Sequence, residues 1–162
     1  MDSCLEIIVK LKDILLEFDG GMVGDTAFQI TRVESGMPDW GTELTEEYNP
    51  HEARLLKAVS FTKGCYTGQE VIARLDTYDK VQKYLMIIEM QDVVNAATPF
   101  DVFLDDEKIG ILTSYAFDPL ENRSVGLGYI KKMYATDDYN LQVEVNIGDH
   151  RIESILRLPP AL

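Results

Sequence analysis

Cysteine and histidine are scarce in this sequence of 162 residues, which contains two of each. Two cysteines, Cys4 and Cys65, are too few for a disulfide-stapled secreted scaffold. Neither they nor His51 and His150 have the paired spacing of a zinc site. The first residues also lack the basic region and the small-residue cleavage site of a signal peptide. We therefore expect a cytoplasmic protein with no metal site of its own.

Basic residues and long apolar runs are also missing. The sequence has 15 Lys and Arg against 28 Asp and Glu, a net charge of -13. Such a charge repels phosphate backbones and anionic membrane surfaces at long range. The longest run without a charged residue, 109–117, has nine residues, far short of the roughly 20 that a transmembrane helix needs. We therefore expect no direct contact with nucleic acid and no membrane span.

The N-terminal region predicts an amphipathic helix. Apolar residues recur at steps of three and four over residues 5–18, with charged residues mostly between them. Ser3 and Glu6 have the spacing of a capping box at the start of this helix. Gly20 and Gly21 predict its end, because glycine readily adopts the backbone conformation that terminates a helix.

The next part of the chain predicts a strand and two further helices. Residues 27–34 alternate with period two, which favours a strand, with a short helix as the alternative. The acidic stretch 42–47 is expected to be a solvated loop. Asn49 before Pro50 then predicts a helix that runs to about Ala58. Thr67 and Glu70 form another capping signature, so a loop with two glycines is expected to lead into a helix there.

Beyond Val81 the sequence becomes rich in strand-forming residues. Six such runs are separated by turn formers such as Asp105-Asp106, Asp118-Pro119 and Asp137-Asp138; the runs are 84–90, 100–104, 108–116, 125–130, 141–145 and 151–156. Short strands at this spacing predict a small antiparallel barrel. The expected fold class is α+β, a helix-strand remnant of an α/β layer followed by a barrel of about six strands. The expected domains are 1–82, a partial α+β middle domain, and 83–162, the barrel.

Cys65 is the first candidate functional residue. It lies two positions before the expected helix cap and two after Lys63, so the positive end of a helix and an ammonium group would both stabilise a thiolate. Gly64 and Gly68 leave little side-chain bulk around the sulfur, and Tyr66 would form one wall of a cleft. The alternative is that Cys65 is a small buried residue of a structural loop.

The pattern Arg32-x-Glu34-x-Gly36 is the second candidate. A carboxylate at the end of a strand can accept two parallel N–H bonds from a flat heterocycle, a geometry suited to the amide-and-amine edge of a pterin or guanine. The alternative is a surface ion pair between Arg32 and Glu34, which would contribute at most about 1 kcal/mol.

These motifs together resemble the folate-binding YgfZ family, a paralogue of the glycine-cleavage T protein. The eight consecutive residues Lys63-Gly64-Cys65-Tyr66-Thr67-Gly68-Gln69-Glu70 match the family signature and are the most specific part of the resemblance. Further similar segments are Arg32-Val33-Glu34-Ser35-Gly36-Met37-Pro38, Pro50-His51-Glu52-Ala53, Val59-Ser60-Phe61-Thr62, Gly110-Ile111-Leu112-Thr113-Ser114 and Gly126-Leu127-Gly128-Tyr129-Ile130. The last two resemble strands of the family's C-terminal barrel.

The resemblance implies a role for each matched residue. Glu34 matches the glutamate that holds the pterin of tetrahydrofolate, and Cys65 matches the signature cysteine, a candidate catalytic residue. Three residues are implied in the folate pocket or its loop: Arg32, Lys63 and Tyr66. Four residues frame the motif: Gly64, Gly68, Gln69 and Glu70. The implied cofactor is tetrahydrofolate or a derivative, and the implied partners are reduced folate and iron–sulfur assembly or client proteins.

Three alternative functions are considered, and the resemblance implies the first two. The first is a folate-binding accessory protein linked to iron–sulfur cluster assembly or repair and to tRNA modification through the modifying enzymes. The second is a folate-dependent aminomethyltransferase, and the third is a non-catalytic docking module. Family members begin with a large domain that forms another wall of the folate cavity and, in aminomethyltransferases, supplies a catalytic aspartate. This chain by itself is therefore expected to bind folate weakly and not to be catalytically complete.

Overall fold

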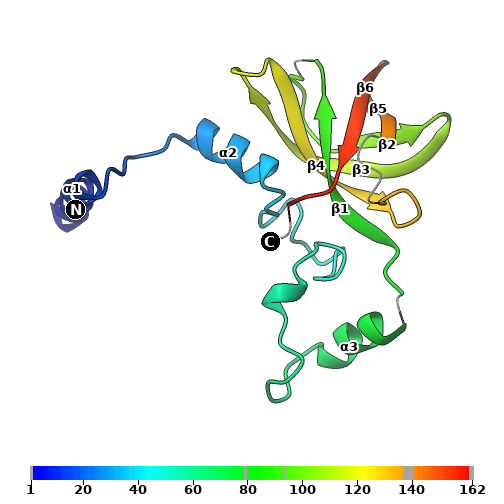
Figure 1. Cartoon of the computed structure of the whole chain (residues 1–162), viewed down its shortest axis with the longest axis horizontal. Helices are drawn as coiled ribbons and strands as arrows, with labels where there is room; N and C mark the ends of the chain where they lie inside the picture. Colours follow the sequence, from blue (N-terminus) through cyan, green and yellow to red (C-terminus); the bar gives the residue numbers. More distant parts are fainter. Residues whose placement is uncertain (1, 79, 93, 137–140, 161–162) are drawn as a thin grey trace.

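A closed six-stranded barrel lies at one side of the computed structural model, with helices and loops extending from it (Figure 1). The structure describes residues 2–78, 80–92, 94–136 and 141–160. The helices are α1 (Asp2–Glu17), α2 (Asp25–Glu34), the 3-10 helix η1 (Leu56–Ala58) and α3 (Gln69–Tyr78). The strands are β1 (Lys83–Met90), β2 (Phe100–Leu104), β3 (Glu107–Asp118), β4 (Arg123–Lys131), β5 (Leu141–Ile147) and β6 (His150–Arg157). The predicted α+β class with an antiparallel barrel is confirmed.

Every strand pair in the barrel is antiparallel. The strands lie in the order β1-β4-β3-β2-β5-β6, and β6 closes the barrel against β1. The pairing of β3 with β4 shifts register between Leu112 and Ser114, where the side-chain alternation changes face. All six predicted strands are present. The predicted turn at Asp137-Asp138 lies outside the described residues.

Two apolar clusters follow from the alternation of side chains along the strands. The barrel interior is filled by side chains that include Met86, Ile88, Leu112, Ile130, Val145 and Leu156. The opposite faces of β1 and β4 contribute Leu85, Ile87, Val125 and Leu127 to a second cluster, which also contains Val33 of α2 and Ala53. Strands β1 and β4 are thus buried on both faces, and this second cluster attaches α2 to the barrel.

Residues 27–34 form a helix, so the predicted strand is wrong and the alternative of a short helix is correct. Helix α2 packs against β3 and β4. Its side chains at Gln29 and Ile30 are partly buried, and those one turn later at Arg32 and Val33 are buried. Because this burial repeats every three residues, it follows the period of a helix. The period-two alternation over so few residues could not distinguish the two structures.

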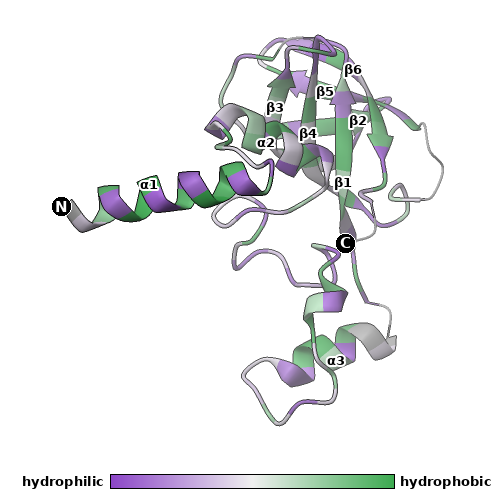
Figure 2. Cartoon of the chain, turned by 60° about the vertical axis from the view of Figure 1, so that its left-hand side comes forward, coloured by the Kyte–Doolittle hydropathy of each residue, from purple (hydrophilic) through white to green (hydrophobic). Residues whose placement is uncertain are grey.

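Helix α1 confirms the predicted amphipathic helix, but it extends away from the barrel (Figures 1 and 2). Every side chain that is described in α1 is exposed. The helix begins at Asp2, so Ser3 lies within it and the predicted capping box is wrong. No described helix is long and apolar enough to cross a membrane.

The predicted helix from Asn49 to Ala58 is wrong beyond its first turn. Asn49 does cap that turn, because its Oδ1 accepts hydrogen bonds from the backbone N–H groups of His51 and Glu52. Arg54 then adopts a left-handed conformation, with φ of 58°, which ends the helical path. The carbonyl of Glu52 accepts a bond from the N–H of Leu85 at 2.8 Å, so the turn is attached to β1 instead.

The signature loop, which begins at Lys63, leads into a helix, as predicted. Helix α3 begins at Gln69, and the residue before it, Gly68, has φ of 87°. Gly68 therefore occupies the capping position that was predicted for Thr67. The loop and α3 lie together at one end of the molecule, away from the barrel (Figure 1).

Candidate functional site

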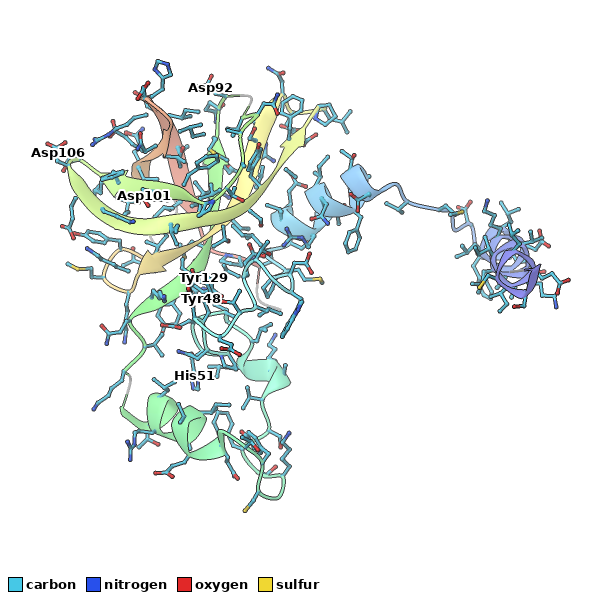
Figure 3. All side chains as sticks on the ribbon, turned by 180° about the vertical axis from the view of Figure 1, so that it is seen from behind. Tyr48, His51, Asp92, Asp101, Asp106 and Tyr129 are labelled. Carbon is cyan, nitrogen blue, oxygen red and sulfur yellow. The ribbon has the colours of Figure 1, made fainter. Side chains whose placement is uncertain are left out.

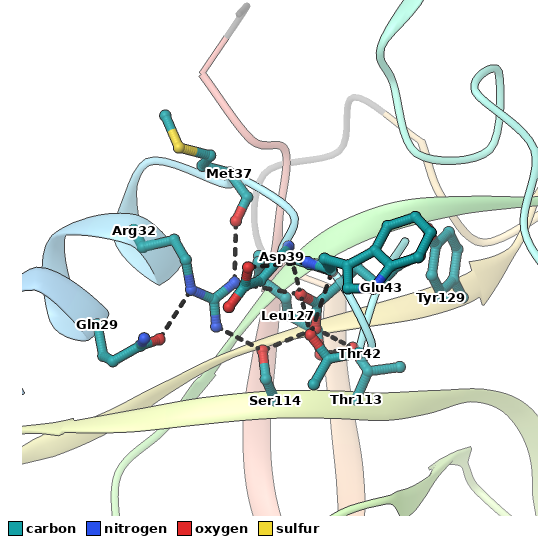
Figure 4. Close-up of polar contacts among 11 residues, drawn as sticks. Gln29, Arg32, Met37, Asp39, Thr42, Glu43, Thr113, Ser114, Leu127 and Tyr129 are labelled. Carbon is teal, nitrogen blue, oxygen red and sulfur yellow. Dashed lines mark hydrogen bonds and ion pairs between the residues drawn. The ribbon is translucent and has the colours of Figure 1, made fainter. Parts of the chain in front are cut away.

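Arg32 is the centre of a buried polar network between α2 and the barrel (Figure 4). Its Nε donates to Gln29 Oε1 at 2.8 Å, Nη1 donates to the carbonyl of Met37 at 3.0 Å, and Nη2 donates to Ser114 Oγ at 3.1 Å. Nη1 also forms an ion pair with Glu43 Oε2 at 3.1 Å. All three guanidinium nitrogens thus have protein partners, which gives Arg32 a structural role in joining α2 to β3.

Glu43 is the carboxylate in this network, and it is fully buried. Its Oε1 accepts hydrogen bonds from Thr113 Oγ1 at 2.5 Å and Ser114 Oγ at 2.7 Å. Its Oε2 accepts from the backbone N–H of Asp39 and from Thr42 Oγ1, besides the ion pair with Arg32 (Figure 4). The expectation that 42–47 is simply a solvated loop is therefore wrong for Glu43, and sequence reasoning missed this residue.

Tyr129 adds a second attachment of the same loop. Its hydroxyl donates to the carbonyl of Glu43 at 2.9 Å, and its ring stacks on Tyr48 with centroids 3.6 Å apart (Figure 3). The Nζ of Lys83 lies 4.3 Å from the centroid of the Tyr48 ring. Burial raises the pKa of Tyr129 above its ordinary value, with the charge of Glu43 acting in the same direction.

Glu34 lies at the end of α2 and belongs to a different set of charges. Arg123 Nη2 donates to Glu34 Oε1 at 3.0 Å, and Arg123 Nη1 donates to Glu89 Oε1 at 2.6 Å. Arg157 Nη1 donates to the same oxygen of Glu89. The four side chains form a row of alternating charge, Glu34, Arg123, Glu89 and Arg157. Among the described residues, Glu34 Oε2 has no hydrogen-bond or ion-pair partner.

The predicted pair between Arg32 and Glu34 is not formed. The two residues are neighbours on α2, yet Arg32 bonds to Glu43 while Glu34 bonds to Arg123. The glycine of the same motif has a packing role. Gly36 has φ of 70°, and a Cβ at this position would lie 2.3 Å from the Cβ of Pro159. The motif therefore joins α2 to both the barrel and the C-terminal segment.

A cavity of about 900 Å³ contains Glu34 in its wall. Its apolar walls include Leu56, Ile87, Val125, Leu158 and the two prolines at 159–160. Its polar wall contains the row of charges from Glu34 to Arg157, together with His51, Arg54, Lys57 and Tyr84. Arg54 is oriented by its bond from Nε to the carbonyl of Leu85 and lies 4.8 Å from the Tyr84 ring centroid. An aromatic ring and a carboxylate oxygen without a partner in the described part of the chain, both in one cavity, fit a flat heterocycle with N–H donors.

The signature loop lies apart from this cavity, and none of its residues is among the cavity-lining residues. Cys65 is exposed, so the alternative of a buried structural cysteine is wrong. Lys63 Nζ lies 4.3 Å from the centroid of the Tyr66 ring, a cation–π contact between two residues that flank Cys65 in the sequence. Gln69 and Glu70 belong to the first turn of α3, where Glu70 pairs with Arg74 at 3.4 Å on the exposed face. The roles predicted for Lys63, Cys65 and Tyr66 stay predictions.

Metal-binding groups do not cluster in the part of the chain that the structure describes: it contains no group of three or more His, Cys, Asp or Glu side chains suited to a metal ion.

Arg32 and Glu34, which were both predicted to contribute to a folate pocket, have different surroundings in the structure. Glu34 lines the cavity, whereas Arg32 is occupied by the network around Glu43. Arg123, which no sequence motif identified, is the cation that contacts Glu34.

Comparison with known proteins identifies the barrel. Residues 83–160 match the glycine cleavage T-protein C-terminal barrel domain. A putative chloroplastic transferase of Arabidopsis thaliana is 39% identical over 114 residues, which cover 70% of this chain and 26% of the relative. An aminomethyltransferase of Aquifex aeolicus is 29% identical over 134 residues, which cover 83% of this chain and 36% of the relative.

A solved structure has the same fold over nearly the whole chain. The glycine cleavage system aminomethyltransferase T from Bartonella henselae matches with a TM-score of 0.77 and 19% identity, covering 99% of this chain and 44% of that protein. The chain thus spans less than half the length of these matched proteins.

Proposed function

We propose that this chain, whose barrel matches the glycine cleavage T-protein C-terminal barrel domain and which is similar to aminomethyltransferases, binds a reduced folate in the cavity lined by Glu34. The observation that carries the proposal is the carboxylate of Glu34 in the wall of a cavity of about 900 Å³, with one oxygen bonded to Arg123 and the other without a partner among the described residues. Tetrahydrofolate or a derivative would supply a one-carbon carrier to this site.

The donor set of the cavity supports this ligand. A pterin presents neighbouring N–H groups on one edge, and a carboxylate is the side chain that accepts such a pair. The apolar residues Leu56 and Leu158 and the ring of Tyr84 offer surfaces for the flat heterocycle. Lys57 lies in the same wall, and its ammonium group suits a carboxylate of the glutamate tail.

A titration with tetrahydrofolate under reducing conditions tests the proposal. We expect saturable binding that Glu34→Gln weakens about tenfold or more, because the substitution replaces a charged acceptor with a neutral amide. Glu46→Gln is the matched control, since Glu46 is exposed in a loop and does not line the cavity. Equal affinities of the parent chain and Glu34→Gln would contradict the proposal.

The finer role that we propose is that of a YgfZ-type accessory protein for iron–sulfur cluster assembly or repair, with an indirect effect on tRNA modification. The exposed thiol of Cys65 in the loop from Lys63 to Glu70 favours this role, because an accessible cysteine two residues from a lysine is suited to a redox or ligand step with a partner protein. The test is genetic complementation: the protein, together with any domain it is joined to, is expressed in cells that lack it, and iron–sulfur enzyme activity is measured. Cys65→Ser should fail to restore iron–sulfur enzyme activity, whereas Cys4→Ser should restore it.

Aminomethyl transfer is the second candidate, because several similar proteins, including one from Thermoanaerobacter pseudethanolicus that is 27% identical over 152 residues, are named aminomethyltransferases. This candidate predicts turnover of an aminomethyl-lipoyl donor with tetrahydrofolate as acceptor. A non-catalytic docking role is the remaining alternative. It predicts that the chain binds a partner protein and does not bind tetrahydrofolate.

A further inference from the structure

We propose that Arg123 is a positioning residue for Glu34 and that the Arg123–Glu34 pair makes the cavity selective for a ligand edge with paired N–H donors. This inference rests on the proposed folate site. It concerns a residue on β4 that lies 89 positions from Glu34 in the sequence and belongs to no motif identified there.

Arg123 is itself held from two sides. Its Nη1 donates to Glu89 on β1 at 2.6 Å while its Nη2 donates to Glu34 on α2 at 3.0 Å. Glu89 in turn accepts a bond from Arg157 on β6. The side chains of Arg123 and Glu89 are 20% and 14% exposed, so solvent screens their contact less than a surface ion pair, whereas the side chain of Glu34 is 38% exposed. The guanidinium therefore connects the end of α2 to two strands of the closed barrel.

Glu34 needs such a partner because it is the last residue of α2. The C-terminal end of a helix carries partial negative charge, which disfavours a carboxylate there. Arg123 offsets this repulsion and holds Oε1 in place, while Oε2 has no partner among the described residues. The result is a fixed acceptor in the cavity wall.

The same contacts define which ligand edge fits. Arg123 donates to two carboxylates, so its positive charge is offset by Glu34 and Glu89. An incoming carboxylate or phosphate would meet the open oxygen of Glu34 and be repelled by it. An edge with an exocyclic amine beside a ring N–H, such as that of a pterin, would instead donate to this oxygen. The affinity of the cavity for a ligand should therefore depend on whether the ligand has this exocyclic amine.

The experiment compares two ligands on substituted proteins that keep their circular dichroism spectrum. The ligands are tetrahydrofolate and its 2-desamino-2-methyl analogue, which lacks the exocyclic amine. Arg123→Met should weaken tetrahydrofolate binding about tenfold and analogue binding less, because the analogue has already lost one of the two N–H donors to the oriented carboxylate. Arg123→Lys should restore part of the affinity. Arg151→Met is the matched control, since Arg151 pairs with Glu144 and lies outside the cavity lining.

Two further measurements separate the possible failures. The double substitution of Glu34→Gln with Arg123→Met should bind tetrahydrofolate no more weakly than Glu34→Gln alone, because Arg123 acts through Glu34. A crystal structure of Arg123→Met should show the Glu34 side chain displaced from its position in the parent protein.

Three results would overturn the inference. They are unchanged or tighter tetrahydrofolate binding by Arg123→Met, an equal loss of affinity for both ligands, and a Glu34 side chain that is not displaced. A different outcome is that Glu34→Gln binds tetrahydrofolate as the parent does while Arg123→Met displaces Glu34. The folate proposal then fails, and the inferred selectivity for a pterin edge fails with it. The role of Arg123 in positioning Glu34 would still hold.

Discussion

Arg32 and Glu43 form an ion pair at 3.1 Å in which both side chains are almost completely buried. The two residues come from α2 and from the acidic loop that follows it, and their polar atoms are further satisfied by Ser114 and Thr113 of β3. The pair therefore links three segments of the chain at one point. Glu34, two residues after Arg32 on the same helix, lines the cavity.

Loss of the Glu43 charge should destabilise the protein strongly. Glu43→Gln would leave the buried guanidinium of Arg32 without its counter-ion, and we expect a loss of about 3–5 kcal/mol in the free energy of unfolding. Urea denaturation followed by circular dichroism measures this value. Glu46→Gln, in the same acidic stretch but exposed, should have little effect. Similar unfolding midpoints for the two variants would contradict the proposed anchoring role.

Gly36→Ala should destabilise the contact between α2 and the C-terminal segment. The new methyl group would overlap Pro159, where the Cβ–Cβ distance would be 2.3 Å, and the backbone has a φ that favours glycine. We expect a cost of about 2–4 kcal/mol from strain and overlap together. Gly41→Ala separates the two effects, because Gly41 also has positive φ but a Cβ at that position would have no neighbouring atom within 4 Å. Equal costs for both variants would show that Pro159 accommodates the methyl group.

Alkaline pH should destabilise the folded protein through Tyr129. Burial raises the pKa of this hydroxyl in the folded state above the value of about 10 that it has in an unfolded chain. Its stabilising contribution is therefore present below pH 10 and is lost as the pH rises above 10, since the unfolded state then releases the proton more readily. Thermal unfolding between pH 8 and 11 should show a steeper loss of stability for the parent than for Tyr129→Phe. Parallel pH profiles would contradict this prediction.

Removal of α1 should leave the stability of the rest unchanged. The described side chains of this helix are all exposed, so its deletion together with the following residues to Asp19 removes no buried contact. We expect urea midpoints of the shortened and parent chains to agree. The deletion should also reduce self-association in sedimentation experiments, because α1 exposes apolar side chains such as Leu5, Ile14 and Leu16. A large drop in the urea midpoint would show that α1 packs against the remainder in solution.

Much of the barrel could be predicted because its strands follow local rules. Runs such as 84–90 and 125–130 are rich in β-branched and aromatic residues and are bounded by turn formers, and all six runs are strands in the structure. The segment 27–34 could not be predicted in the same way. Its short alternation fits two periods, and only packing against β3 and β4 selects the helix.

The candidate site shows where local patterns stop being informative. Glu34 could be identified from a motif, but its partner Arg123 lies on a distant strand and has no recognisable spacing to it. Glu43 gave no signal either, because an acidic residue in an acidic stretch is usually solvated. The buried pair with Arg32 could have been suspected only from the serine and threonine at 113–114, which interrupt an apolar strand.

The amino-acid sequence alone determined the strand segments of the barrel, the amphipathic N-terminal helix and the loop that presents Cys65, since each depends on the order of neighbouring residues. Only the tertiary structure decided that Arg32 is a buried anchor, that Glu34 faces Arg123 and that Gly36 contacts Pro159. The physical reason is that the partner of a charge is chosen by proximity in the folded chain and by desolvation, and neither follows from a residue's position along the sequence.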